Sequence, residues 1–345
     1  MRIRSALAAC AAAAALLASQ ASFAGEDEAA ALPTVNFTSV MEVSPYKPMS
    51  YALDYMADLV SKRTGGRFTI TRRMSYGDLS SSDCLVKIVV NTEDITVVPI
   101  EVIGNFMPWV RVMSLPYIFT PRDYEGLAMD GAANRELCRT ISDKETRIIA
   151  LDTWYTDYLH LVMRDHPVER PEDLRGQNIW LPSAGPLSEY LASMGANPVI
   201  MPMNSAVDAI RRGVIDGMVT PLNSMASRNP AYEHMRFVSL FSLSRGGFVV
   251  LVSQQRFEAL PPAYQRILRE AALDAEARLN DFSEECARVV LGRLRRNPRI
   301  VLSSPDLTQF KSYADRIRLI YLKRYPQFAA RLRNALYGQA GDQSR

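Results

Sequence analysis

Short strand patterns alternate with helical patterns along most of this chain, and that alternation constrains the fold more than any other feature. Thr34–Val40 alternates polar and apolar residues, Ala52–Val60 repeats apolar residues at helical spacing, and Arg67–Thr71 alternates again. Further strand patterns follow at Ile95–Val98, Arg147–Leu151, Gln177–Leu181, Val199–Met201, Gly217–Thr220 and Gly247–Val252. A repeated β-α-β order predicts an α/β fold with mostly parallel sheets.

From Pro261 onward the pattern is helical, interrupted only at Asn297-Pro298. The whole chain has 345 residues, of which 48% are hydrophobic and 22% charged, so collagenous and largely disordered chains are excluded. This length predicts about two domains. A cleft between them is the first place to expect a binding site.

The first 24 residues have the pattern of an export signal. Arg2 and Arg4 precede an apolar run over residues 6–17, and Ser22-Phe23-Ala24 has the small-x-small pattern of a cleavage site. A lipoprotein signal would use Cys10, but that residue precedes most of the apolar run. We therefore expect cleavage near Ala24 and a periplasmic location.

Charge and hydropathy exclude several classes of partner. Removing residues 1–24 takes away two of the 40 basic residues and none of the 37 acidic ones, so the mature charge is +1 and offers no basic footprint for nucleic acid. No later segment approaches the length of a membrane span, so we expect no stable membrane insertion. Cys84, Cys138 and Cys286 are odd in number, so they allow at most one internal disulfide, and the sequence does not say whether any of them pair.

Five short motifs occur along the chain: Leu59–Arg67 (LVSKRTGGR), Leu115–Phe119 (LPYIF), Pro171–Gly176 (PEDLRG), Gly213–Gly217 (GVIDG) and Leu260–Gln265 (LPPAYQ). In type and order these motifs resemble those of the DctP-type solute-binding proteins of TRAP transporters. Each motif is also local turn chemistry, since glycine ends helices and Asp173 can accept backbone N–H groups. The motifs therefore identify a scaffold and need not touch a ligand.

The resemblance implies a two-lobe periplasmic binding protein, type II-like, with crossover strands and a long lobe-spanning helix. Its segments place lobe I at residues 34–157 plus 246–285, and lobe II at residues 158–245 plus 286–337. Such a receptor closes over a small-molecule solute by hinge motion and delivers it to the membrane subunits of a TRAP transporter. The resemblance implies a monomer that is not an enzyme and carries no cofactor or metal.

The positions that usually bind a carboxylate differ from the resembled family. An arginine expected in the strand after the PEDLRG motif is replaced by Trp180, and a second arginine position aligns with His160. A glutamate found in the first lobe of some members falls near Pro99, with Glu101 two positions on. The family scaffold is therefore kept while its anion clamp is missing.

The remaining expected ligand contacts, by the same resemblance, are Glu42, Tyr46, Trp154, Asp157, Ser183, Met203, Asn204, Thr220 and Asn223. Aromatic faces, carboxylates and neutral hydrogen-bonding groups suit a polyol, a sugar-like or aromatic solute, or a cation better than a bare carboxylate. Structural alternatives stay open: Trp180 and Trp154 could be core residues, His160 a buried imidazole and Met203 a gap-filler.

Two functions other than solute transport are an enzyme and a sensory receptor. The three histidines show no metal-ligand spacing, and neither a G-x-S-x-G elbow nor a Walker A loop occurs, which argues against an enzyme. A receptor that reports its solute to a membrane signalling protein would use the same ligand-triggered closure. The sequence does not separate sensing from transport.

Overall fold

The computed structural model describes residues 32–42, 48–73, 79–128, 130–226 and 230–338. The predicted signal peptide and Tyr46 lie outside these residues. Met203 and Asn204 are described only as backbone, at the start of a helix.

Ten strands form one continuous mixed sheet in the order β2-β1-β3-β9-β4-β7-β5-β6, with β8 pairing to β4 and to β10. The strands are β1 (Val35–Val40), β2 (Phe68–Arg72), β3 (Ile95–Pro99), β4 (Ile148–Met163), β5 (Asn178–Leu181), β6 (Asn197–Ile200), β7 (Gly217–Pro221), β8 (Phe237–Ser239), β9 (Arg245–Ser253) and β10 (Val301–Ser303). The α/β fold class is confirmed, and each predicted strand is present. The two three-residue strands, β8 and β10, were not predicted.

The sheet is less parallel than expected. Parallel pairing joins β1 to β2 and β3, β5 to β6 and β7, and β8 to β10, but every pair that involves β4 or β9 is antiparallel. These two strands run between the halves of the molecule in opposite directions, so the prediction of mostly parallel sheets was too simple at the centre.

Strand β4 belongs to both halves of the molecule. Ile148 to Tyr158 pair with β9, whereas Leu159 to Met163 pair with β7. Its pairing with β9 shifts register between Tyr155 and Tyr158, an irregularity that bends a strand. The change of partner falls beside the lobe limit expected at residues 157/158, although the limits themselves stay a prediction.

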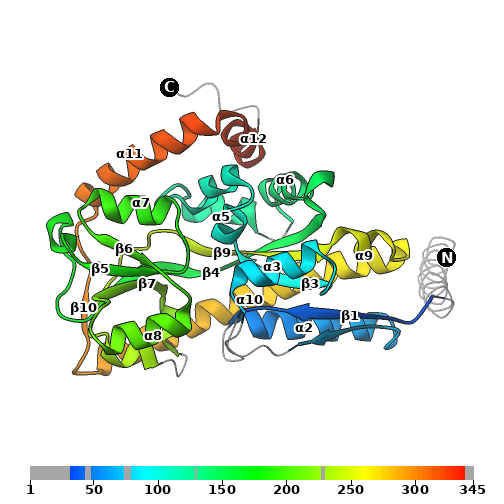
Figure 1. The fold of residues 1–345 in the computed structure, drawn as a ribbon, viewed down its shortest axis with the longest axis horizontal. Helices are drawn as coiled ribbons and strands as arrows, with labels where there is room; N and C mark the ends of the chain where they lie inside the picture. The colour runs from blue at the N-terminus through cyan, green and yellow to red at the C-terminus, as the bar shows by residue number, and fades with distance from the viewer. Residues whose placement is uncertain (1–31, 43–47, 74–78, 129, 227–229, 339–345) are drawn as a thin grey trace, which may run out of the picture.

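Helices cover the sheet on both sides (Figure 1). The α-helices are α2 (Pro48–Arg63), α3 (Ser81–Val89), α4 (Ile100–Ile103), α5 (Pro121–Leu127), α6 (Ala132–Ile141), α7 (Pro186–Ser193), α8 (Met203–Arg211), α9 (Gln254–Glu258), α10 (Pro262–Arg296), α11 (Thr308–Arg324) and α12 (Pro326–Tyr337). The 3₁₀ helices are η1 (Pro108–Ser114), η2 (Lys144–Thr146), η3 (Pro171–Leu174), η4 (Leu222–Ala226) and η5 (Pro230–His234).

Helix α10 is the predicted long helix, and it spans both halves of the molecule. Its 35 residues contact α2 in the first half and η4 in the second, and Figure 1 shows the helix lying along both halves. Buried small and apolar residues of its first half, such as Ala271, Ala275 and Leu279, pack in one core with α2 and β9. The final helix, α12, packs on α5 and α6, which lie in the segment assigned to lobe I, and Tyr337 donates to Asp123 Oδ1 at 2.6 Å.

Turn residues end the elements as the sequence predicts. Gly65 and Gly66 have φ of +57° and +78° at the end of α2, a region that favours glycine, and Gly213 has φ of +76° after α8. Asp173 accepts the backbone N–H groups of Glu169 and Arg170 at 2.9 and 3.0 Å. The family-like motifs therefore have local structural roles.

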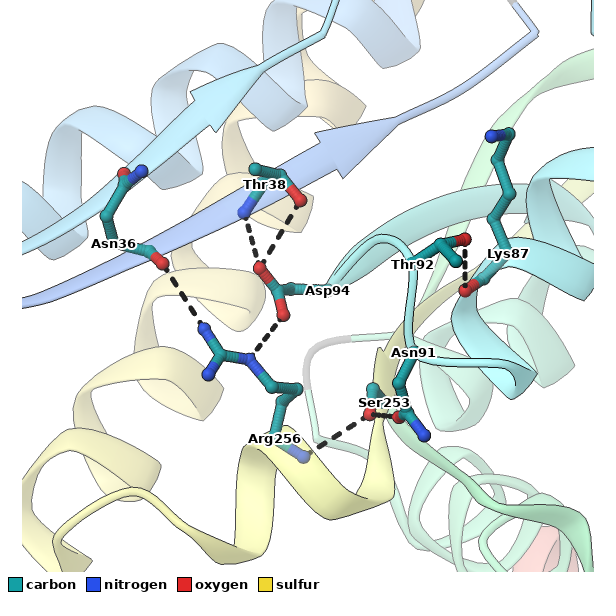
Figure 2. A network of polar contacts seen from close by, with 8 residues as sticks. All are labelled: Asn36, Thr38, Lys87, Asn91, Thr92, Asp94, Ser253 and Arg256. Carbon is teal, nitrogen blue, oxygen red and sulfur yellow. Dashed lines mark hydrogen bonds and ion pairs between the residues drawn. The ribbon is translucent and has the colours of Figure 1, made fainter.

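A polar network fixes β1 to the loop before β3 and to the start of α9 (Figure 2). Asp94 accepts from the Thr38 backbone N–H at 2.7 Å and pairs with Arg256 at 2.5 Å. Arg256 also donates to the Asn36 carbonyl at 3.3 Å and lies 4.9 Å from the centre of the Phe37 ring. These contacts join three segments that are far apart in the sequence.

Candidate ligand-binding cavity

A cavity of about 530 Å³ lies between the two halves of the sheet. One wall comes from the residues after β1 and β3 and from the starts of α2 and α3, and the other comes from the residues after β5, β6 and β7. Thr156 and Leu159 of β4 line it between these walls. Ligands of α/β proteins commonly bind beyond the carboxyl ends of parallel strands, so the topology alone makes this cavity the candidate site.

The charged groups of the lining are all acidic. Among its described residues the lining contains two carboxylates, Glu42 and Glu101, and no arginine, lysine or histidine. Both carboxylates belong to the first wall. The opposite wall supplies neutral polar groups, namely Ser183, Thr220, Asn223, Ser224 and Tyr232.

Glu42 follows β1 and is held at the start of α3. Its Oε2 accepts from the Ser81 backbone N–H at 2.7 Å and from the Ser81 hydroxyl at 2.6 Å. Ser80 caps the same helix and accepts from the Asp83 N–H. Carboxylates at a helix N-terminus are stabilised by the free N–H groups there, so the Glu42 charge is partly compensated.

Glu101 lies in α4, directly after β3. It forms no ion pair with any residue that the structure describes, and burial raises the pKa of its carboxyl group. A carboxylate in this environment binds either a proton or a cation.

The second wall holds an amide without a partner. Asn223 is 3% exposed, and its Nδ2 has no hydrogen-bond partner among the described residues. The neighbouring Thr220 Oγ1 lies 3.0 Å from the Tyr232 hydroxyl. Because a buried N–H without a partner is costly, Asn223 can donate to a bound molecule at little desolvation cost.

Trp180 is both a core residue and part of the cavity lining. The side chain is 5% exposed, packs with Met218 and Ile210 in the core of the second half, and also lines the cavity. Its Nε1 donates to the Met201 carbonyl at 2.9 Å, which ties β5 to the segment after β6. It therefore occupies the place of the expected arginine and presents an indole that is already hydrogen-bonded.

The structure brings Glu42, Trp180, Ser183, Thr220 and Asn223 together around the cavity. Three other expected contacts lie outside the lining: Trp154, Asp157 and His160. Trp154 is fully buried and donates to the Ala272 carbonyl at 3.1 Å, which is the core role left open for it.

His160 is also a core residue in this structure. It is 5% exposed, and its Nδ1 accepts from the Ser242 N–H at 3.2 Å. Burial lowers the pKa of His160 to about 4. The neutral imidazole therefore cannot replace an arginine as an anion-binding cation near neutral pH.

Asp157 is the third expected ligand contact that lies outside the lining. It is partly buried beside the lining of the cavity. Its Oδ1 accepts from the Tyr158 N–H at 2.7 Å, and burial raises its pKa. It is separated in sequence by one residue from Leu159, which does line the cavity.

Neither Arg164, directly after β4, nor Arg211, at the end of α8, replaces the missing clamp. Arg164 donates to the Ile210 carbonyl, and Arg211 pairs with Asp208 at 3.0 Å on an exposed surface. Neither lines the cavity.

Sequence reasoning missed Ser81, Tyr232 and Phe248 in the lining and placed Glu101 only as a neighbour of the expected position. Glu101 could have been found, because it follows a buried parallel strand, where ligand contacts collect. No sequence signal distinguishes Tyr232, which enters from η5.

Free thiols and metal-ligand clusters add nothing to the site. Cys84, Cys138 and Cys286 are unpaired in the structure. In the part of the chain that the structure describes, no three His, Cys, Asp or Glu side chains gather as metal ligands. No described helix is long and apolar enough to span a bilayer.

Two α/β halves, joined by paired strands and a long helix around a cavity at the strand ends, define a two-lobe solute-binding protein. The chain matches the family model of the bacterial extracellular solute-binding proteins, family 7 (DctP), over residues 39–322. It belongs to this family, whose members are the periplasmic solute receptors of TRAP transporters.

Relatives and solved structures agree with this assignment. The chain is 22% identical over 291 residues to the C4-dicarboxylate-binding protein DctB of Bacillus subtilis, an alignment covering 84% of this chain and 82% of that protein. A TRAP periplasmic solute-binding protein of Chromohalobacter salexigens with bound D-glucuronate superposes with a TM-score of 0.80 at 22% identity, covering 88% of this chain and 100% of that one. One of Desulfovibrio salexigens with bound orotic acid has a TM-score of 0.79 at 19% identity, covering 87% and 98%. At these identities the structures show a shared fold, and the two-lobe expectation is confirmed.

Proposed function

We propose that this protein captures a small solute in the cavity between its lobes and delivers it to the membrane subunits of a TRAP transporter. Membership of the solute-binding family and the position of the cavity at the strand ends of both lobes support the proposal. Enclosure between lobes excludes water, which strengthens each polar contact to the solute. The protein then acts as a monomeric periplasmic receptor and not as an enzyme.

We infer the chemical class of the ligand from the charge of the cavity lining. Solved relatives bind acids such as glucuronate and orotic acid. Here the described lining offers two carboxylates and no cation, and Trp180 stands where an arginine is expected. We propose that the solute is not held by an arginine–carboxylate clamp.

Titration calorimetry against two panels of solutes tests this proposal. One panel holds monocarboxylates, and the other holds neutral polyols, aromatic solutes and cations. Losing one partner of a buried charge pair costs about 2–5 kcal/mol, so we expect monocarboxylates to bind at least about thirtyfold more weakly than the best member of the second panel. Submicromolar binding of a monocarboxylate would contradict the missing clamp.

Delivery is tested by reconstitution. Membrane subunits encoded beside this protein, placed in vesicles, should take up the bound solute only when this protein is added. Binding without uptake, together with stimulation of an adjacent membrane sensor, would support the signalling role instead.

We also propose that export removes residues 1–24. Mass spectrometry of the exported protein should show an N-terminus at Gly25. An acylated N-terminal Cys10 would contradict it.

A further inference from the structure

We propose that the solute carries a cationic group that binds Glu101 on lobe I and a hydrogen-bond acceptor that binds the Asn223 amide on lobe II. This inference rests on the proposed capture of a solute between the lobes. It narrows the ligand to amines and related cations that also carry a hydroxyl or carbonyl oxygen.

The first step is the negative charge of the first wall, which no cationic side chain of the described lining offsets. Glu101 lines the cavity without an ion pair to any described residue, and Glu42 adds a second negative charge to the same wall. An ionised carboxylate removed from water is stabilised by a cation and destabilised by another anion. A closed cavity with this lining therefore favours a cationic solute over an anionic one.

Glu101 is a better contact for the cation than Glu42. The Glu42 carboxylate already accepts two hydrogen bonds from Ser81 at the start of α3, and these also hold the helix. The Glu101 carboxylate interacts only with neutral groups, its own backbone N–H and the Ser114 side chain, and no cationic side chain lines the described cavity wall beside it. Of the two, its charge gains more from a cationic ligand.

The second step is the unpartnered amide across the cavity. Asn223 is nine-tenths buried or more, lines the cavity and has no partner for Nδ2 among the described residues. Its N–H groups can only donate, so the group that it binds must be an acceptor. A hydroxyl or carbonyl oxygen of the solute satisfies it.

The rest of the lining suits the body of such a solute. Phe248, Trp180 and Tyr232 contribute aromatic side chains, and Met49 and Val97 contribute apolar surface. Aromatic rings attract cations as well as apolar faces. A cavity of about 530 Å³ lies within the range of small-molecule sites, roughly 300–1,000 Å³.

Two sets of probes with matched scaffolds test the inference. One set is glucosamine, glucose and glucuronate, and the other is 4-hydroxybenzylamine, 4-hydroxybenzyl alcohol and 4-hydroxybenzoate, so each cation also carries a hydroxyl group for the Asn223 amide. Dissociation constants are measured by calorimetry on the full mature protein, on Glu101→Gln and on Glu125→Gln, whose side chain is on the exposed face of α5. Thermal melting of each variant shows whether it is folded.

We expect the cation to bind most tightly in each set. Glu101→Gln should weaken the cation at least about thirtyfold and change the neutral member by less than about threefold, and Glu125→Gln should change neither. Should Glu101→Gln fail to fold, Glu101→Asp, which keeps the charge, replaces it, and retention of the cation preference supports the proposal.

Three outcomes would overturn the inference: failure of both cations to bind, a carboxylate as the tightest member of a set, or a cation preference that survives Glu101→Gln. Tight binding of glucuronate with lobe closure would agree with solute capture between the lobes. It would contradict only the proposal that the solute is a cation. Binding of any probe outside the cavity, without closure, would instead count against the proposed function.

Discussion

Burial shifts the pKa of two ionisable residues of β4, Asp152 and His160. Asp152 in β4 is fully buried, accepts from Asn134 Nδ2 at 2.5 Å and from the Thr153 N–H at 2.9 Å, and leaves its Oδ2 without a partner among the described residues. Burial raises the pKa of Asp152 from its ordinary 3.8 to about 7. Between about pH 4 and pH 7, the Asp152 carboxyl group therefore keeps a proton in the folded protein that it releases in the unfolded chain.

This shift predicts a loss of stability as the pH rises. Between about pH 4 and pH 7 the folded state binds more protons than the unfolded state, so the free energy of unfolding should fall by up to about 1.4 kcal/mol per pH unit from this group. Asp152→Asn keeps the acceptor and should flatten that decline. Urea denaturation at several pH values measures it, with the exposed Asp281→Asn as control; equal slopes in all three proteins would contradict the assignment.

His160 gives a second prediction at this scale. Because burial lowers its pKa to about 4, the imidazole should stay neutral between pH 5.5 and 8. Carbon-13 NMR of the ring should show no titration of His160 over that range, whereas a free imidazole titrates near ~6.5. Titration near neutrality would revive His160 as an anion-binding cation.

The ion pair of Asp94 differs from the surface pairs of the chain. Asp94→Ala removes the acceptor of the Thr38 N–H as well as the partner of Arg256, and we expect the free energy of unfolding to fall by about 1–3 kcal/mol (Figure 2). The exposed Arg288–Glu285 pair is the matched control, since Glu285→Ala should cost about 0.5 kcal/mol or less. Equal losses would mean that the network contributes no more than a surface pair.

Among the secondary-structure elements, short strands end at the walls of the cavity, whereas the long strands β4 and β9 connect the lobes. β5, β6 and β7 have four or five residues each, and the segments after them form one wall. Trp180 in β5 holds the segment after β6 through Met201. The position of that wall therefore depends on one indole hydrogen bond in addition to the strand pairing.

Two substitutions, Trp180→Phe and Trp180→Ala, separate the contribution of the Trp180–Met201 hydrogen bond to stability from the contribution of packing. Phenylalanine keeps most of the apolar contact but loses the donor, so we expect a loss of about 0.5–1.5 kcal/mol of unfolding free energy. Alanine should cost about 3–5 kcal/mol because it also leaves a cavity. Chemical denaturation measures both; a larger loss for phenylalanine than for alanine would contradict this division.

The molecule as a whole consists of two lobes joined by a few connecting segments. The lobes are joined by β4, β9 and α10 (Figure 1). The lining residues place the cavity between the lobes. Hinge motion about a few connecting residues is the usual consequence of this arrangement.

Closure should be visible in solution scattering. A bound solute should reduce the radius of gyration, with residues 34–157 plus 246–285 moving against the rest as the predicted lobes. A buffer match without solute is the control. An unchanged radius at saturation would contradict capture by closure.

The sequence determined more of the scaffold than of the site. Strand alternation, the glycines after α2 and α8 and the turn at Asp173 follow local rules of backbone sterics and hydrogen bonding, so they were predictable residue by residue. The three-residue strands β8 and β10 were not predictable in this way, because they pair with each other across 64 residues of sequence.

What only the tertiary structure decided is which side chains meet. Trp180 and Trp154 look alike in sequence, yet one lines the cavity while the other is sealed beneath α10. His160 and Glu101 differ in the same way. Burial keeps the His160 imidazole neutral in the core, whereas the Glu101 carboxylate lines the cavity without an ion pair to any described residue. Local patterns fix how the backbone turns, whereas exposure and charge compensation depend on packing between segments distant in sequence, which no local pattern records.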